Sequence, residues 1–350
     1  MKDHITIGMD LGDRDHIAVV LDTDGHEIEC VKLTNTKVSM KRYFQRYGGA
    51  TVAIEAGTHS PWISRLLEQL GCQVYVGNPH KLRVIWDSTD KSDERDARML
   101  AMIARLEPKL LWPIRHRDLG AHSDLEMIKA RDTLVQSRTK LINHVRSVVK
   151  GIGERLPSCS AASFATRVVD LIPASLQPAL MPLMDIIAQM TEGIRAFDKQ
   201  IATLSTERYP QVRWLQQVQG VGPVTALTFI LTIEDPGRFA KSRMVGPYLG
   251  LTPRRDQSGA VNKQLRITKA GNGYLRKLLV GCAHYIIGPF GADSDLRRHG
   301  LAIAARGGKN ARKRAAVAVA RKLAVLLHRL WVSEQDYIPL KAKARVKKAA

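Results

Sequence analysis

The fold of this chain is decided by Ile5-Thr6-Ile7-Gly8-Met9-Asp10, a short apolar strand that ends in a carboxylate and leads into a turn at Gly12. Residues 17–21 form a second apolar run, and residues 27–33 form a third after the hairpin-type turn Asp22-Thr23-Asp24-Gly25. Strands joined by such tight turns pair as antiparallel neighbours. The sequence therefore predicts a three-stranded meander at the start of the chain.

The segments that follow alternate between helix and strand. Helical patterns cover residues 38–47 and 61–71, and each leads into an apolar strand, at 51–55 and 72–76. A further helix is expected at 93–106. A meander followed by alternating helices and strands is typical of a mixed sheet covered by helices, so we predict an α/β domain over residues 1–115.

The middle of the chain is helical without strands. Apolar residues recur three, four or seven apart at 119–155 and at 177–208, on either side of a Ser-rich loop at 157–163. This pattern predicts an antiparallel coiled-coil hairpin over residues 116–208, and an ordinary helical bundle arm fits the periodicity equally well. Residues 209–335 are expected to form a mainly α unit, and residues 336–350 a basic, solvated tail.

Charge is distributed unevenly along the chain. The 350 residues include 54 Lys and Arg against 33 Asp and Glu, a net charge of +21. Residues 1–100 carry 13 basic and 15 acidic groups (−2), whereas residues 251–350 carry 22 and 5 (+17). A near-neutral domain joined to a strongly cationic one is typical of proteins that bind a polyanion. The composition, 45% hydrophobic and 25% charged, excludes a disordered or fibrous chain.

The spacing of the cysteines and the length of the apolar stretches indicate the cellular compartment of the protein. The four cysteines are isolated from one another, so neither a zinc site nor a disulfide framework is expected and a reducing cytoplasm is the natural location. The N-terminus has no signal-peptide pattern, and the apolar stretch at 278–292 is shorter than the roughly 20 residues that span a bilayer. We therefore expect no membrane partner.

Two strands of the predicted sheet end in carboxylates. Asp10 closes the first strand beside a glycine turn, and Glu55 closes the strand at 51–55. If the first and fourth strands are neighbours, both side chains point into the same place, where a metal or phosphate could bind. The alternatives are a plain turn aspartate and an unrelated surface glutamate. An actin-like sugar kinase begins similarly, but no convincing phosphate-binding glycine loop occurs late in the chain.

A third acidic segment is Lys91-Ser92-Asp93-Glu94-Arg95-Asp96-Ala97-Arg98. Asp93 and Asp96 are three residues apart and share one face of the expected helix. Taken singly, Ser92 or Asp93 is better explained as a helix cap. Taken with Asp10 and Glu55, the segment completes four carboxylates, enough to hold two Mg²⁺ ions about 4 Å apart for phosphoryl transfer.

The cationic half contains a glycine turn within the stretch Leu215–Ala226. Gly220-Val221-Gly222-Pro223 lies between apolar segments and opens a helix, which is typical of a helix-hairpin-helix element. The backbone N–H groups of such a turn face a phosphate and bind DNA without reading its sequence. A plain corner between two helices is the alternative interpretation.

Ser258 follows in an expected loop that is crowded with cations. Seven Lys and Arg fall within the 24 residues from Arg254 to Lys277. They are Arg254, Arg255, Lys263, Arg266, Lys269, Arg276 and Lys277. A hydroxyl among guanidinium groups could attack a phosphate, with the developing charge stabilised by the cations. Chemistry alone favours the simpler alternative, a turn serine beside Gly259.

The order of these segments resembles the DEDD-type transposases of bacterial insertion sequences, a recombinase family guided by a bridge RNA. The resemblance rests on motifs that occur in family order over nearly the whole chain. They are Gly8-Met9-Asp10-Leu11-Gly12, Ile54-Glu55-Ala56, Lys91–Ala97, Gly220-Val221-Gly222-Pro223, Gly250-Leu251-Thr252-Pro253, Gln257-Ser258-Gly259, Ile267-Thr268-Lys269-Ala270-Gly271-Asn272 and residues 318–326. Each motif is weak alone, and their ordered conjunction carries the resemblance.

The resemblance implies an N-terminal RuvC-like (ribonuclease H-like) domain, a coiled-coil connector and a C-terminal transposase domain. It implies that Asp10, Glu55, Asp93 and Asp96 bind Mg²⁺, two ions per site. Ser258 matches the family's nucleophilic serine, which implies a covalent phosphoserine–DNA intermediate. Leu265 departs from the family pattern, in which a small glycine precedes the Arg-Ile-Thr-Lys run.

The resemblance also implies the partners of the protein. They are donor and target double-stranded DNA, a structured non-coding guide RNA that pairs with both, and further copies of the chain, as a dimer or tetramer. Such a protein works in the bacterial cytoplasm at the nucleoid. Two alternatives stay open from the sequence: a metal-dependent endonuclease of the Holliday-junction type that uses only the four carboxylates, and a non-catalytic nucleic-acid-binding protein.

Overall fold

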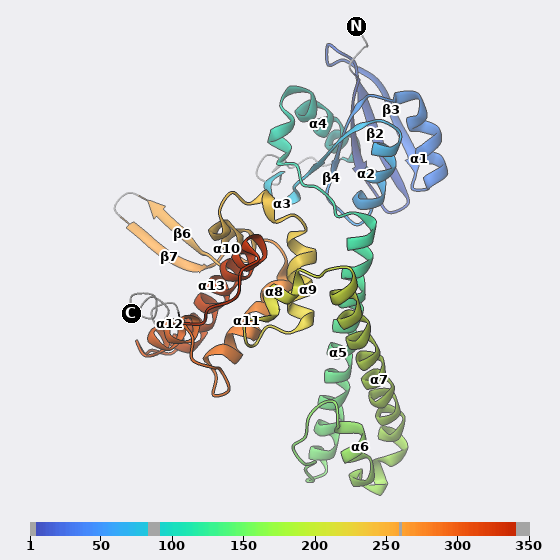
Figure 1. The fold of residues 1–350 in the computed structure, drawn as a ribbon. Coiled ribbons are helices and arrows are strands. Elements are labelled where there is room, and N and C mark those ends of the chain that lie inside the picture. Colours follow the sequence, from blue (N-terminus) through green and yellow to red (C-terminus); the bar gives the residue numbers. More distant parts are fainter. Residues whose placement is uncertain (1–4, 83–91, 259–260, 341–350) are drawn as a thin grey trace, which may run out of the picture. The chain divides into compact units, whose positions relative to one another are not determined.

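The computed structural model describes residues 5–82, 92–258 and 261–340 of the chain, which divides into two compact units, Met1–Asp118 and Leu119–Ala350 (Figure 1). Lys91 and Gly259 of the predicted motifs and the predicted tail from residue 341 onward lie outside the described residues.

The first unit is built on a five-stranded mixed sheet. Its strands are β1 (Thr6–Leu11), β2 (Asp15–Leu21), β3 (Glu27–Thr34), β4 (Thr51–Glu55) and β5 (Gln73–Gly77). The strand order is β3-β2-β1-β4-β5, antiparallel from β1 to β3 and parallel from β1 through β4 to β5. This confirms the predicted mixed sheet, and the first and fourth strands are neighbours in it.

Helices cover both faces of this sheet. The helices and 3-10 turns are α1 (Lys37–Phe44), η1 (Gln45–Tyr47), α2 (Ser60–Gln69), α3 (Pro79–Leu82), α4 (Asp93–Leu106) and η2 (Pro108–Leu111). Ile7, Met9 and Ile54 point to one face and pack with α1 and α2, whereas Val19 and Ala53 point to the other and pack with α4. Because side chains alternate along a strand, each strand contributes to both layers.

Two long antiparallel helices begin the second unit. They are α5 (Leu119–Gly151) and α7 (Gln177–Glu207), joined through the short α6 (Phe164–Val168), η3 (Val169–Leu171) and η4 (Ala174–Leu176) (Figure 1). Arg131 bonds Asp198 at 2.6 Å, and one heptad further along α5, Arg138 bonds Thr191 at 3.1 Å, one heptad earlier in α7. This register establishes the antiparallel hairpin; its supercoiling stays a prediction.

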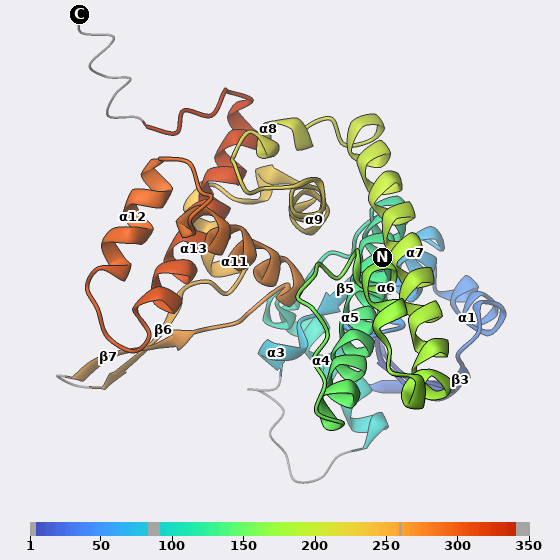
Figure 2. The same cartoon turned by 90° about the horizontal axis from the view of Figure 1, so that it is seen from below.

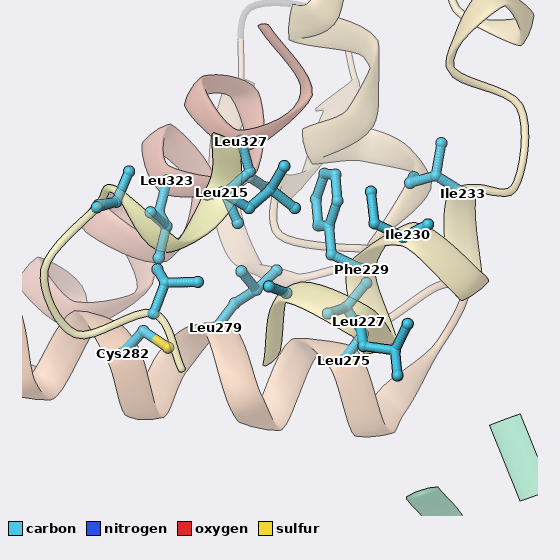
Figure 3. Close-up of a cluster of buried hydrophobic side chains, with 14 of the residues drawn as sticks. Leu215, Leu227, Phe229, Ile230, Ile233, Leu275, Leu279, Cys282, Leu323 and Leu327 are labelled. Carbon is cyan, nitrogen blue, oxygen red and sulfur yellow. The ribbon is translucent and has the colours of Figure 1, made fainter. Parts of the chain in front are cut away.

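The remaining helices of the second unit enclose its largest hydrophobic core. They are α8 (Val212–Gln216), α9 (Pro223–Ile233), η5 (Pro236–Arg238), η6 (Ser242–Met244), α10 (Val245–Tyr248), α11 (Gly273–Ile287), α12 (Asp295–Ala304) and α13 (Ala311–Ser333) (Figures 1 and 2). Phe229, Leu279 and Leu323 come from three of these helices and are fully buried against one another (Figure 3). Leu125 of α5 joins the same core, so the foot of the long hairpin is part of it.

The second unit also contains a β-hairpin that the sequence did not predict. It consists of β6 (Pro253–Ser258) and β7 (Val261–Ile267), which pair antiparallel as a separate two-stranded sheet. The predicted loop around Ser258 is therefore wrong: this serine is the last residue of a strand. The unit is otherwise helical, as expected.

All four cysteines are free, as their spacing predicts. Among the described residues no single helix is long and apolar enough to cross a membrane. One bent pair, Phe164–Leu171 with Ala174–Glu207, passes that test by length and composition alone.

Candidate active site

Asp10 and Glu55 lie at the same edge and on the same face of the sheet. Gly8 pairs with Ala53 and Met9 with Ile54 in the parallel β1–β4 ladder, so Asp10, one residue before the end of β1, and Glu55, the last residue of β4, lie at the carboxyl ends of neighbouring strands. Met9 and Ile54 point into the core with α1 and α2. Since successive side chains alternate, Asp10 and Glu55 point to the opposite face, where α4 packs.

Gly8 brings α4 onto that face. A Cβ atom at Gly8 would lie 2.0 Å from the carbonyl oxygen of Ala97 and 2.4 Å from the backbone nitrogen of Ala101, so only glycine fits under the helix. Ala97 and Ala101 are themselves fully buried and small, which lets the helix backbone approach β1. The first turn of α4, with Asp93 and Asp96, is thereby held close to Asp10. The sequence signal for this contact is the glycine inside a strand.

Ser92 caps α4 and leaves the two aspartates available. Its hydroxyl oxygen accepts the backbone N–H of Arg95 at 3.3 Å, and its backbone is extended, as at an ordinary N-cap. The cap is therefore Ser92 and not Asp93. Asp93 is exposed and Asp96 half-buried.

The electrostatics of Asp10 show that the four acids interact. Burial raises the pKa of Asp10, and the negative charges of Asp93, Asp96 and Glu55 raise it further, to about 6 from 3.8, against the lowering effect of the Leu11 backbone N–H. Like charges raise a carboxyl pKa only where they lie close enough to repel it. The carboxylates predicted from three separate segments thus converge on one place in the fold.

The donor set fits a divalent cation. Four carboxylates offer the hard oxygen ligands that Mg²⁺ prefers, and their mutual repulsion is what two positive charges would offset. Within the described ranges, the only three ligating side chains whose donor atoms all lie within 4.8 Å of one another are Asp22, Asp24 and His26, in the exposed β2–β3 turn. The donor atoms of the four acids lie farther apart than this, as expected for carboxylates that repel one another.

The loop after Glu55 is fixed by a hydrogen-bonded serine that the sequence reasoning missed. The buried Ser60 hydroxyl accepts the Gly57 N–H at 2.9 Å and lies 2.9 Å from Nε2 of His116. These bonds tie the loop at the end of β4 to the segment that closes the first unit. No pattern in the sequence links a serine to a histidine 56 residues away.

Ser258 lies at the tip end of the β6–β7 hairpin. It pairs with Val261, and Asp256 pairs directly with Lys263 on the same face of the hairpin. Ser258 is exposed, and within the described residues its hydroxyl has no hydrogen-bond partner. The hydroxyl is therefore accessible, with a cation two residue pairs away.

At the foot of the β6–β7 hairpin, the end opposite Ser258, two of the predicted motifs cross closely. They are residues 250–253 and residues 267–272. Gly250 and Gly271 both have positive φ (64° and 65°), and a Cβ on either would lie 2.2 Å from backbone atoms of the crossing segment. Lys269 donates its backbone N–H to the Gly250 carbonyl at 3.1 Å. Asn272 then caps α11 by accepting the Leu275 N–H at 3.0 Å. The two glycine motifs thus fix the direction in which the hairpin leaves the core.

Two of the predicted nucleic-acid-binding cations have protein partners instead. Arg276 donates Nη1 to the carbonyl oxygens of Leu249 (3.0 Å) and Ala270 (2.7 Å), so its guanidinium clamps the hairpin foot, and Lys277 forms an ion pair with Asp132 at 3.0 Å. The other predicted cations are exposed, on the hairpin or just after it: Arg254, Arg255, Lys263, Arg266 and Lys269.

The glycine turn lies where the sequence places it. Gly220 has φ of 92°, a conformation that disfavours other residues, and Gly222 is the N-cap of α9 with Pro223 in its first turn. The preceding helix, α8, has only five residues. The turn therefore opens a helix N-terminus at the surface, and the helix-hairpin-helix assignment stays a prediction.

A mixed α/β unit with four converging carboxylates, joined to a cationic unit that presents a serine, defines an enzyme that acts on nucleic-acid phosphates. Comparison with known families agrees. A family model described as "Transposase IS116/IS110/IS902 family" matches residues 212–294, which include Ser258, and an IS110-type DEDD model described as "Transposase" matches residues 7–154, which include all four acids.

Individual relatives are similar over most of the chain. A "Probable family 20 transposase" of Pseudomonas aeruginosa is 25% identical over 95% of this chain and 98% of its own. The transposase of insertion sequence element IS1111A from Coxiella burnetii is 28% identical over 83% of this chain and 79% of its own. That of IS1328 from Yersinia enterocolitica is 25% identical over 79% and 82%. Residues 7–154 and 212–294 thus carry transposase domains of the IS110/IS116/IS902 family, and the homologues support a DNA transposase activity; the DEDD domain implies dependence on a divalent metal.

Proposed function

We propose that this transposase cleaves and exchanges DNA strands between element ends and target DNA through a covalent phosphoserine intermediate at Ser258, assisted by Asp10, Glu55, Asp93 and Asp96. The convergence of the four acids, seen in the raised pKa of Asp10, is the observation that carries the metal-assisted part. The strand order β3-β2-β1-β4-β5 supports the RuvC-like assignment of the first unit.

The residues divide the chemistry between the two units. Ser258 Oγ forms a bond to phosphorus while the bond from phosphorus to one deoxyribose oxygen breaks; the serine gives up its proton and the leaving oxygen gains one. Exposed Arg254, Arg255 and Lys263 on the hairpin stabilise the charge that develops on the phosphate. Bound Mg²⁺, two ions in our proposal, would supply electrostatic stabilisation of the phosphate oxygens at the four acids.

The remaining surface binds the DNA backbone. We propose that the N–H groups of the Gly220–Gly222 turn contact a phosphate and that Arg266 and Lys269 extend this contact along the strand. Arg276 positions the foot of the hairpin, and Lys277 pairs with Asp132 of α5, so we leave both out of the proposed DNA contacts. A guide RNA and composite sites in a dimer or tetramer rest on the family resemblance.

Strand exchange on element-end DNA tests this proposal. The full chain, supplied with Mg²⁺ and the transcript that flanks the element, is compared with Asp10→Ala and Ser258→Ala. Gln257→Ala, beside the serine but on the other face of the hairpin, and Glu68→Gln, an exposed acid of α2, are matched controls. Both site variants should lose exchange, and both controls should retain it.

Covalent trapping separates the proposal from the endonuclease alternative. After denaturation, wild type should carry DNA on Ser258 and Ser258→Ala should carry none. Cleavage by Ser258→Ala without any adduct would favour a nuclease that uses only the carboxylates. Metal-independent binding without cleavage by any form of the protein would favour a non-catalytic nucleic-acid binder.

A mixing experiment tests whether two protomers share one site. Asp10→Ala retains Ser258, and Ser258→Ala retains the four acids. If each site combines the first unit of one protomer with the second unit of another, a mixture of the two inactive variants recovers exchange. A mixture as inactive as its components would place each complete site within a single chain. Omitting the transcript from the same assay tests the guide RNA.

A further inference from the structure

A cavity of about 570 Å³ lies in the second unit between α12, α13 and the segment that follows α13. This volume is in the range of sites that hold a small molecule or a nucleotide. The cavity is formed largely by α13, which lies beyond residues 212–294 and 7–154, the ranges matched by the two family models. It contains none of the residues assigned above to strand exchange.

The motif at 318–326 divides between the core and this cavity. Val319, Leu323 and Leu327 are fully buried in the core of the second unit. The opposite face of the helix lines the cavity, with Arg321 and Lys322 first, Val325 and Leu326 one turn later, and Arg329 one turn later again. Cations thus lie on both sides of an apolar floor along one helix face. At a rise of 1.5 Å per residue, Lys322 and Arg329 are about 10 Å apart along the helix axis.

The wall of the cavity opposite α13 is held in place by hydrogen bonds from two backbone N–H groups. The N–H of Asp295 donates to the Pro339 carbonyl at 2.8 Å, and the N–H of Tyr337 donates to Oε1 of Gln217 at 2.6 Å. Tyr337 and Pro339 both line the cavity. These bonds tie the chain after α13 to the start of α12 and to the turn after α8. The three sides of the cavity, which are α12, α13 and the segment after α13, are therefore fixed.

Three cations and one acid, Asp295 at the start of α12, line the cavity, so its net charge favours an anionic occupant. Arg321, Lys322 and Arg329 are exposed, and none has an ion-pair partner in the part of the chain that the structure describes. His299 of α12 also lines the cavity, and burial, followed by the charges of Lys322 and Arg306, lowers its pKa. The uncharged form of its ring, which this shift favours, offers one hydrogen-bond donor and one acceptor.

We propose that this cavity binds one unpaired nucleotide of single-stranded DNA, with its base on Val325 and Leu326 and its two flanking phosphates at Arg321/Lys322 and at Arg329. The order cation, apolar floor, cation matches phosphate, base, phosphate. DNA is the substrate of a transposase, and strand exchange exposes unpaired nucleotides. The inference rests on that activity and not on the phosphoserine step.

Binding of a short fluorescent oligothymidylate to the full chain, compared with its duplex, tests the inference. The double variant Arg321→Glu/Lys322→Glu should weaken single-strand binding by about tenfold or more, because two phosphate contacts become repulsive. Arg312→Glu/Lys313→Glu makes the same charge change at exposed positions of the same helix outside the cavity and should have a much smaller effect. Ala318→Trp fills the cavity without changing charge and should also weaken binding by about tenfold, because the base loses its apolar contact with Val325 and Leu326.

The other outcomes would overturn the inference. Equal losses in the two double variants would mean general attraction to the cationic surface, and unchanged binding by Ala318→Trp would mean that the cavity is not used. A loss confined to RNA of the same sequence, or to an acidic peptide, would assign a different occupant. Ser258→Ala should bind the strand like wild type, so failure of the phosphoserine proposal leaves this result readable.

Discussion

Replacing Asp10 by Asn should stabilise the first unit when no divalent metal is present. The pKa of Asp10 is raised in the folded protein to about 6 from 3.8, so the native state binds a proton more tightly than the unfolded state does. The free energy of unfolding therefore falls as pH rises through the window from about 4 to about 6, and the loss is complete above it. Asn carries no charge and avoids this loss.

The size of the effect follows from the shift. About two pKa units at 1.36 kcal/mol each give about 3 kcal/mol as an upper limit. Asp10 is only half-buried, so solvent screening reduces this to about 1–2 kcal/mol. For a domain near 100 residues, 1 kcal/mol corresponds to about 4–8 °C in Tm.

Hydrogen exchange of the full chain in EDTA is the assay, read on peptides of β1, β4 and α4 so that the first unit is observed by itself. At pH 7.5 Asp10→Asn should be better protected than wild type, and near pH 4 the two should coincide. Added Mg²⁺ should protect wild type more than the variant. Glu68→Gln, an exposed acid of α2, should follow wild type throughout.

Two results would refute the reasoning. If Asp10→Asn is no more protected than wild type at pH 7.5 in EDTA, the four acids do not repel one another in the folded protein. If the variant gains as much protection from Mg²⁺ as wild type does, the metal does not bind at Asp10.

Three further predictions concern packing. Gly8→Ala should destabilise the first unit by about 1–3 kcal/mol in thermal unfolding and abolish DNA cleavage, because its Cβ would overlap the backbone of α4. Gly271→Ala, which has positive φ and would place Cβ 2.2 Å from the Tyr248 carbonyl oxygen, should abolish strand exchange while Mg²⁺ protection of the first unit persists in hydrogen exchange. Thr191→Val should cost about 1–3 kcal/mol in denaturant unfolding by leaving the buried Arg138 guanidinium without its hydroxyl partner, and Arg138→Met in the same chain should restore most of that loss.

The first unit could be predicted from sequence because its strands are apolar and its turns carry glycine or aspartate. The observed strand at Thr51–Glu55 and helix at Asp93–Leu106 have the predicted ends. The strand order itself was not predicted, although a meander followed by helix-linked strands has few topologies. What could not be predicted is the close approach at Gly8, because a glycine in a strand does not say which backbone it meets.

The β6–β7 hairpin escaped prediction because its residues are those of a loop. From Arg254 to Ser258 every side chain is polar and exposed, so no alternation of apolar residues marks a strand. The partners of Arg276 and Lys277 were equally hidden: a cation in a basic stretch looks the same whether it faces DNA or a carbonyl oxygen. Only the glycines of the motifs at the hairpin foot indicated an unusual backbone from the sequence. In the structure both of these glycines have positive φ.

The isolation of this hairpin bears on how Ser258 becomes reactive. A two-stranded sheet is marginally stable alone, and here it is held mainly at its foot, by Arg276 and the crossing glycines. The described residues around Ser258 include a cation, Lys263, opposite Asp256, but no group that hydrogen-bonds the serine hydroxyl and could take its proton. A serine hydroxyl is a weak nucleophile without such a group. In the mechanism proposed above, groups assembled with the DNA would take this proton, and the exposed serine would stay unreactive toward phosphates until a complete complex forms.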